Sequence, residues 1–349
     1  MQAGFFKHTL QFKQPGGTSR GVLNEKPSWF LLISDGMHTG IGEISIIPGL
    51  SQDDHTRIEA VLKEVCRMIT KDLRIPDDFL LPFPAVRFGL ETARLDLQRQ
   101  GSKELFSSAF TRGEKPIRIN GLIWMGEQSY MQQQIREKIE QGYHCIKLKI
   151  GNLDFEQEIS LLKGIRQEFP ASDMELRVDA NGAFASAEAP EKLERLATLD
   201  IHSIEQPIRQ GQPQEMAALC ATSPLPIALD EELIGIAGHT DKQQLLETIR
   251  PQYIILKPSL TGGLAASEEW IRVADSLGID WWITSALEAN IGLNAIAQWT
   301  WSLNKPVTHG LGTGMLYTNN IPSPLTIQNA ALYYDTEKDW DLSIFTSRG

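Results

Sequence analysis

The amino-acid sequence predicts an α/β fold in which a TIM-type barrel of parallel strands and crossover helices follows an N-terminal α+β capping domain. After residue 117, strand and helix patterns alternate, with a new strand about every 25 to 30 residues. Before residue 117, three strand patterns come first and two helical patterns follow. Eight successive strands favour a closed barrel over an open sheet, and the first strand-to-helix turn lacks the Gly-x-Gly-x-x-Gly of a dinucleotide site.

The composition is that of an ordinary globular protein and excludes several classes of function. Of the 349 residues, 42% are hydrophobic and 22% are charged, and the net charge of −11 comes without a basic patch, so we expect no nucleic-acid partner. Three widely spaced cysteines predict neither disulfides nor a Cys-x-x-Cys metal site, which favours a cytoplasmic location. The sequence has no long apolar run, so we expect no membrane partner. It does not indicate the oligomeric state.

The capping domain is expected to span residues 1–117. Its turn-rich segments at 15–21 and 48–51 are expected to be mobile lid loops. Residues 17–21 formally match the Gly-x-Ser-x-Gly nucleophile elbow, but a strand rather than a helix follows them, which argues against an elbow. The expected elements of this domain are strands at 5–12, 29–34 and 40–47 and helices at 54–72 and 85–98.

The barrel is expected to span residues 118–320. Its expected strands are 118–125, 144–150, 175–180, 201–206, 226–231, 253–258, 280–286 and 307–311. Its expected helices include 131–141, 156–168, 187–198, 242–249 and 264–277. The last segment, 321–349, continues no repeat and is expected to pack back on the capping domain.

A carboxylate stands at the end of each of three consecutive barrel strands: Asp179, Glu205 and Asp230. Because catalytic groups of such barrels come from the carboxyl ends of several strands, these side chains should converge, and an all-oxygen set selects a hard cation such as Mg²⁺. Each acid taken singly could instead cap a helix. The period of two points Asp230 inward, leaves Glu231 to support the ligands, and points Arg177 inward beneath Asp179, where it needs a carboxylate partner.

Three lysines should face these carboxylates. The alternation of the second strand sends Lys147 and Lys149 to one face, and Lys257 ends the sixth strand across the barrel. Mutual repulsion and a cation should lower the lysine pKa values, as a lysine base requires. The alternatives are an exposed edge strand for the pair and a surface position for Lys257.

Taken in order, these motifs resemble the enolase superfamily, in its muconate-lactonizing subgroup. The matching segments are Lys147-Leu148-Lys149, Asp179-Ala180-Asn181, Glu205-Gln206-Pro207, Asp230-Glu231 and Lys257. The resemblance implies a modified TIM barrel of seven or eight β/α units, with Mg²⁺ as the cofactor and Mn²⁺ as a substitute. It also implies that Lys149 removes a proton α to a carboxylate, that Lys147 holds this carboxylate, that Lys257 acts from the opposite face, and that Asn181 supports the ligands.

The end of the eighth strand distinguishes reactions within the superfamily. The run containing Gly312 and Thr313 lacks the Asp-x-Asp that dipeptide epimerases place there, and resembles the branch that dehydrates a succinyl-hydroxycyclohexadiene carboxylate during menaquinone synthesis. The implied partner is a small dicarboxylate, with Ser285 and Arg20 as further contacts. These glycines could also be plain turn formers or a phosphate cradle.

Two other reaction classes stay open. An N-acylamino acid racemase or dipeptide epimerase would use Lys149 and Lys257 as opposed acid and base. A Schiff-base aldolase would need only Lys257.

Overall fold

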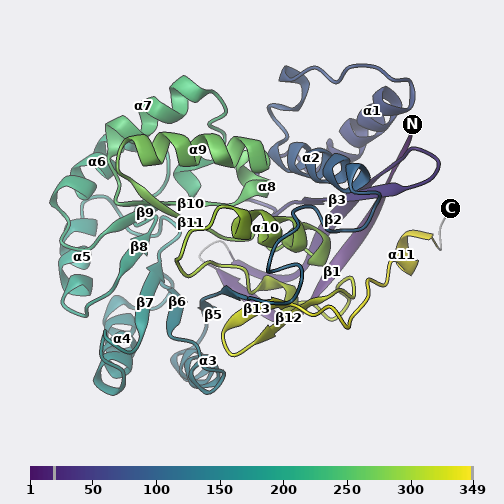
Figure 1. The fold of residues 1–349 in the computed structure, drawn as a ribbon. Coiled ribbons are helices and arrows are strands. Elements are labelled where there is room, and N and C mark those ends of the chain that lie inside the picture. Colours follow the sequence, from purple (N-terminus) through teal and green to yellow (C-terminus); the bar gives the residue numbers. More distant parts are fainter. Residues whose placement is uncertain (19–20, 347–349) are drawn as a thin grey trace.

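The capping domain is an antiparallel sheet with helices on one face. The computed structural model describes residues 1–18 and 21–346. Within them, strand order in this sheet is β1-β2-β3, and the helices lie beside it in Figure 1. The elements are β1 (Gln2–Thr18), β2 (Gly21–Ser34), β3 (Thr39–Ser45), α1 (Ile58–Thr70), η1 (Asp78–Leu80) and α2 (Pro84–Gln98).

Strict alternation along β2 gives the capping sheet two buried faces. Trp29, Leu31 and Ile33 belong to a core shared with α1 and α2. Phe30 belongs to a second core, built with residues 289–291 of the barrel and with the C-terminal tail, where Leu32 packs against it. The period of two therefore places the sheet between its own helices and the rest of the molecule.

Of the segment 15–21, expected to be a long loop, residues 15–18 and 21 belong to the β1–β2 hairpin, and residues 19 and 20 lie outside the described residues. Strand β1 extends to Thr18, with a register shift between Gln11 and Gly16, and β2 begins at Gly21. The Gly17 carbonyl accepts a hydrogen bond from the Met125 amide at 3.2 Å. The expectation was wrong because glycines at 16 and 17 serve close packing against the barrel rather than a free turn.

The barrel sheet confirms the predicted fold class. Seven parallel strands follow the order β11-β10-β9-β8-β7-β6-β5, and helices surround them (Figure 1). The strands are β5 (Gly121–Ile123), β6 (Cys145–Lys149), β7 (Glu175–Asp179), β8 (Ser203–Glu205), β9 (Ile227–Leu229), β10 (Tyr253–Leu256) and β11 (Asp280–Ile283). The helices are α3 (Gln128–Glu140), α4 (Phe155–Glu168), α5 (Ala189–Ala197), α6 (Pro213–Thr222), η2 (Glu231–Leu233), α7 (His239–Ile249), α8 (Pro258–Thr261), α9 (Leu264–Ser276), α10 (Asn290–Ser302) and η3 (Thr313–Met315).

The eighth predicted strand, 307–311, is reduced to two isolated parallel bridges. His309 bridges to Ile119, just before β5, and Gly310 bridges to Thr284, just after β11. The ring is therefore closed, but by single residues. Glycine at 310 and 312 weakens a strand, which explains why no regular strand forms. A side chain at Gly310 would collide with Thr284, so this position requires glycine.

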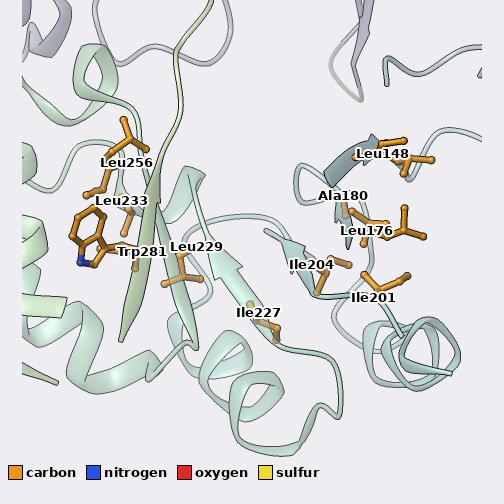
Figure 2. Close-up of a cluster of buried hydrophobic side chains, with 14 of the residues drawn as sticks. Leu148, Leu176, Ala180, Ile201, Ile204, Ile227, Leu229, Leu233, Leu256 and Trp281 are labelled. Carbon is orange, nitrogen blue, oxygen red and sulfur yellow. The ribbon is translucent and has the colours of Figure 1, made fainter. Parts of the chain in front are cut away.

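The alternation of the barrel strands separates an apolar outer layer from a polar interior. Outward residues such as Leu148, Leu176, Ile204 and Leu229 belong to the large core between strands and helices, part of which Figure 2 shows. The inward positions include the charged residues of the strand ends. Polar side chains in a barrel interior must find partners there, because water is excluded.

The C-terminal segment contacts both parts of the molecule. Strands β12 (Leu325–Gln328) and β13 (Ala331–Tyr334) form a small sheet with β4 (Ile117–Arg118). The chain then reaches α11 (Ser343–Thr346), where the Phe345 ring meets Phe30 and Phe6 edge-on, at centroid distances of 5.1 and 5.9 Å. Among the described helices, none combines the length and apolarity needed to cross a membrane.

We predict that Gly42→Ala lowers the free energy of unfolding by about 1–3 kcal/mol, the range for overpacked sites. A Cβ at Gly42 would collide with the Gly89 carbonyl and lie 2.7 Å from the Ala93 amide, both in the backbone of α2. Gly4→Ala is the matched control, because no atom of the described residues lies within 4 Å of a Cβ at that β1 position. Urea unfolding of both variants measures the difference, and equal midpoints would show that α2 does not require this close approach.

Candidate active site

Strand register brings the charged residues of the barrel interior to one level. Lys149 lies opposite Asp179 in the β6–β7 pair, and Asp179 lies opposite Glu205 in the β7–β8 pair. Asp230 directly follows β9 and Lys257 directly follows β10. All five positions point inward by the period of two, so the carboxyl ends of five neighbouring strands meet in one buried cluster.

Ion pairs link the cluster into a network. Lys147 Nζ lies 2.8 Å from Asp179 Oδ2 and also contacts Glu205 Oε2. Lys257 Nζ contacts Asp230 Oδ2 and lies 3.5 Å from Glu205 Oε1. Lys147 and Lys257 therefore flank Glu205, and every buried carboxylate of the set faces an ammonium group.

Lys149 has a different environment. Its Nζ donates to Asp179 Oδ2 at 2.6 Å and to Asn181 Oδ1 at 2.8 Å. The Asn181 amide in turn donates to Glu231 Oε1 at 3.0 Å. Asn181 has a positive φ of 46°, a conformation that Asn adopts more readily than most residues, and this turn aims its side chain back at Lys149.

The charges shift one another's pKa values in opposite directions. Burial alone would raise the pKa of Asp179, but the ammonium groups of Lys147 and Lys149 hold it well below its usual range. Lys257 likewise outweighs burial and lowers the pKa of Asp230. Burial and the neighbouring Asp179 charge raise the pKa of Glu205 to about 8. Glu205 is therefore the least well compensated acid of the three.

The expected lowering of the lysine pKa values is not what this arrangement produces. Burial alone would lower the pKa of Lys147, but the Asp179 and Glu205 carboxylates outweigh it and raise the pKa above its usual value. The same balance raises the pKa of Lys257, with Asp230 as the main partner. The expectation counted repulsion between lysines and an added cation, whereas here each of these two ammonium groups is bound to carboxylates.

The chemistry of the donor set fits a hard divalent cation. Asp179, Glu205 and Asp230 supply only carboxylate oxygens, and Glu205 Oε1 is buried without a hydrogen-bond donor. Within residues 1–18 and 21–346, no set of three or more acidic, His or Cys side chains already has metal-binding geometry. Lys147 and Lys257 contact the carboxylate oxygens of Asp179 and Asp230 that a cation would use.

Arg177 points into the barrel as expected, but its contacts lie deeper than the cluster. Its Nε donates to Glu175 Oε1 at 2.6 Å, and its guanidinium lies 4.3 Å from the ring centre of Trp282. A third contact reaches the Thr308 carbonyl at 3.1 Å. The carboxylate partner that we expected is thus Glu175 of the same strand, and Arg177 fills the barrel floor rather than supporting Asp179.

A cavity of about 570 Å³ opens above the cluster. Lys147, Lys149 and Lys257 line it together with all three predicted substrate contacts that the structure describes, Ser285, Gly312 and Thr313. The Ser285 and Thr313 hydroxyls are hydrogen-bonded at 2.7 Å, which joins the ends of the seventh and eighth strands. The fourth predicted contact, Arg20, lies outside the described residues.

The capping domain supplies cavity walls, only part of which lie in the segments 15–21 and 48–51 that were expected to be lids. They come from the β1–β2 hairpin and from the segment after β3, and comprise Lys13, Gln14, Gly21, Val22, Leu23, Ile47, Pro48 and Leu50. No local pattern marks these residues, because they meet the barrel only in the folded molecule. The one signal was the placement of turn-rich segments at 15–21 and 48–51 in the chain.

Comparison with known protein families shows which family the chain belongs to. The Enolase C-terminal domain-like family matches residues 130–336, more than half of the sequence. The chain belongs to the enolase superfamily. Within it, the chain is 50% identical to o-succinylbenzoate synthase of Desulfotalea psychrophila, over 95% of this chain and 98% of that protein.

Two further comparisons agree with this assignment. The crystal structure of MenC from Desulfotalea psychrophila superposes with a TM-score of 0.86 at 47% identity, covering 95% of this chain and 99% of that one. N-succinylamino acid racemase of Thermus thermophilus is 29% identical over 79% of this chain and 75% of that protein. The racemase is thus a more distant relative than the synthase.

We predict that Lys257→Met lowers the free energy of unfolding by about 3 kcal/mol in the presence of chelator, because removing one partner leaves buried carboxylates uncompensated. Lys192→Met is the control, since Lys192 pairs with the exposed Glu188 at 2.9 Å and should cost less than about 1 kcal/mol. Denaturant unfolding compares the two variants. A Lys257→Met protein as stable as the wild type would show that the ion-pair network is not needed for folding.

Proposed function

We propose that the protein dehydrates 2-succinyl-6-hydroxy-2,4-cyclohexadiene-1-carboxylate to 2-succinylbenzoate, a step of menaquinone biosynthesis. The observation that carries the proposal is the cluster of three lysines and three strand-end carboxylates beneath the cavity, in a chain 50% identical to a protein of this activity. The reaction needs a base beside an acidic C–H bond and positive charge around a developing dianion, and the cluster offers both.

Lys149 is the proposed base. In its neutral form its amine takes the ring proton α to the carboxylate, and the C–H electron pair moves into the ene-diolate. The C–O bond then breaks on the same face, the ring becomes aromatic, and the Lys149 ammonium returns the proton to the departing hydroxide, which leaves as water. Asn181, hydrogen-bonded to Lys149 at 2.8 Å, orients the Nζ toward the cavity.

The other two lysines act as fixed charges in this proposal. Lys147 binds the ring carboxylate, and Lys257 stabilises the ring from the opposite face through a cation-π contact. Both line the cavity and both have pKa values raised by carboxylates, which keeps them charged near neutral pH. A fixed positive charge requires this property, so the raised pKa values support the assignment.

Asp179, Glu205 and Asp230 are the proposed ligands of a divalent cation, with Mg²⁺ as the first choice and Mn²⁺ as a substitute. Enzymes of the enolase superfamily combine a lysine or histidine base with one or two Mg²⁺ ions. Bound here, the cation would supply Lewis acidity that stabilises the negative charge on the substrate carboxylate. The buried, undonated Glu205 Oε1 supports this assignment.

The walls of the cavity suit a dicarboxylate with a flexible arm. The joined Ser285 and Thr313 hydroxyls line the cavity, and so do residues of the β1–β2 hairpin and of the segment at 47–50. We propose that these capping elements act as lids that keep water from the ene-diolate. The second candidate is racemisation of N-succinylamino acids, which the Thermus thermophilus relative favours, because it would use the same lysines.

Ultraviolet absorbance tests the proposed function directly. We predict that the wild-type protein with Mg²⁺ converts the cyclohexadiene substrate to an aromatic product, and that exhaustive chelation abolishes the reaction. Asp179→Asn, Glu205→Gln and Asp230→Asn should each lower turnover by a factor of about 10³ or more, the scale of losing a group that stabilises developing charge. Full activity in all three variants after chelation would end the metal assignment, and absence of product with Mg²⁺ would end the dehydratase assignment.

A pair of conservative variants distinguishes dehydration from racemisation. We predict that Lys257→Arg keeps more activity than Lys149→Arg, because arginine preserves a fixed charge but cannot act as a base near neutral pH. The measurement is kcat/KM of both variants on the cyclohexadiene substrate, with deuterium incorporation into recovered substrate. Equal losses, combined with rapid deuterium exchange and no aromatic product from the wild type, would favour the racemase.

A further inference from the structure

A fully buried carboxylate stands next to the active site without lining its cavity. Glu288 has no exposed surface and follows β11 closely. Its Oε2 accepts a hydrogen bond from the Ala286 amide at 2.6 Å, and its Oε1 accepts one from the Ser259 hydroxyl at 2.5 Å. The proposed chemistry assigns Glu288 no part.

The two bonds of Glu288 join two segments that each carry a residue of the cavity. Ser259 lies two residues after Lys257, in the first turn of α8. Ala286 directly follows Ser285. One carboxylate thus bridges the end of the sixth barrel strand to the end of the seventh, immediately behind the side chains that face the substrate.

The backbone turn around Leu287 is strained and needs hydrogen bonds to hold its conformation. Leu287 adopts a positive φ of 60°. This backbone conformation is unfavourable for a bulky side chain such as Leu and is adopted more readily by Gly or Asn. Its carbonyl accepts a hydrogen bond from the buried Tyr317 hydroxyl at 2.7 Å. The strained turn is therefore held from both sides, by Tyr317 on the carbonyl of Leu287 and by Glu288 on the amide of Ala286.

The capping domain reaches the same turn through two further buried ionisable side chains, Lys26 and Glu43. Lys26 Nζ donates to Ser45 Oγ at 2.8 Å, and this hydroxyl donates to the Ala286 carbonyl at 3.0 Å. Glu43 accepts hydrogen bonds from the Ala289 and Gly292 amides, at 2.8 and 2.9 Å, where α10 begins. Both sides of residues 286–289 are thus tied by buried ionisable groups.

Burying the Glu288 carboxylate is energetically unfavourable. Burial raises its pKa to about 7, the neighbouring Glu43 charge acts in the same direction, and the Ser259 hydroxyl and Lys26 oppose them. An apolar residue would avoid the desolvation cost but would leave the Ala286 amide and the Ser259 hydroxyl without an acceptor. The geometry therefore supports one role for the Glu288 side chain, which is to bridge Ser259 and Ala286.

We propose that Glu288 is a positioning residue that holds Lys257 and Ser285 at a fixed separation by bridging Ser259 to Ala286. The inference rests on the proposed function for its kinetic consequences, because it assumes that Lys257 and Ser285 face the substrate. The coupling of the ends of β10 and β11 by one side chain does not depend on which reaction the protein catalyses.

Kinetics of a double-mutant cycle test the role in the reaction. Glu288→Met and Ser259→Ala should each lower kcat by about 10- to 100-fold, with KM changed less than about threefold, because a misplacement near 1 Å acts mainly on the chemical step. The double variant should lose no more than the worse single variant, since both substitutions break the same bridge. Ser259→Thr, which keeps the hydroxyl, should recover most of the kcat.

Glu91→Met is the matched control. Glu91 is a half-buried carboxyl whose pKa burial raises, and it accepts amide hydrogen bonds from Leu264 and Ala265, at 2.6 and 3.0 Å, at the start of α9. It touches no residue of the cluster. This variant should reproduce any loss of melting temperature seen with Glu288→Met while keeping the wild-type kcat.

Amide hydrogen exchange tests the coupling without relying on catalysis. In both Ser259→Ala and Glu288→Met, peptides covering 257–262 and 284–290 should exchange faster together, and in Glu91→Met neither should change. Wild-type exchange at both segments, or multiplicative kcat losses in the double variant, would overturn the proposal. A wild type that forms no aromatic product would overturn the proposed function alone, and the exchange result would still decide the role of Glu288.

Discussion

Charge compensation inside a dry barrel is the constraint on which the rest of this structure depends. Three carboxylates and three ammonium groups stand at one level of the barrel interior, where an unpaired charge would cost several kcal/mol. The network leaves one acid, Glu205, incompletely satisfied. That imbalance makes the cluster receptive to a further positive charge, and the same lysines that compensate the acids also line the space where a substrate anion would sit.

This constraint explains why the surrounding elements are held so tightly. Ion pairs among short strand ends tolerate little displacement, so the turns that follow those strands need their own fastenings. Asn181 and Leu287 both adopt positive φ values, and each turn is pinned by buried hydrogen bonds. The capping domain also stabilises this region through Glu43, whose carboxylate accepts hydrogen bonds from the Ala289 and Gly292 amides at the start of α10.

Sequence reasoning was strongest where the period of two decides the answer. Alternation alone placed Lys147 and Lys149 on one face, Asp230 inward and the apolar residues outward, because a strand's geometry does not depend on its neighbours. It was weakest where two distant segments meet. The glycines of the hairpin suggested a loop, yet they allow contact with Trp124 and Met125. The partner of Arg177, the shortened eighth strand and the direction of the lysine pKa shifts likewise depend on contacts that no local pattern encodes.

The placement of Phe345 has a consequence for how the chain folds as it is made. The face of the capping sheet that carries Phe30 is completed by residues 340–345, more than 300 positions later in the chain. On a ribosome that adds about 5–20 residues per second, the sheet emerges first and waits many seconds for its cover. During that interval its apolar face is open to solvent, to chaperones and to other nascent chains. Substitutions at residues 340–345 would therefore affect the yield of folded protein through the capping domain, which is synthesised before the barrel, rather than through the barrel beside them.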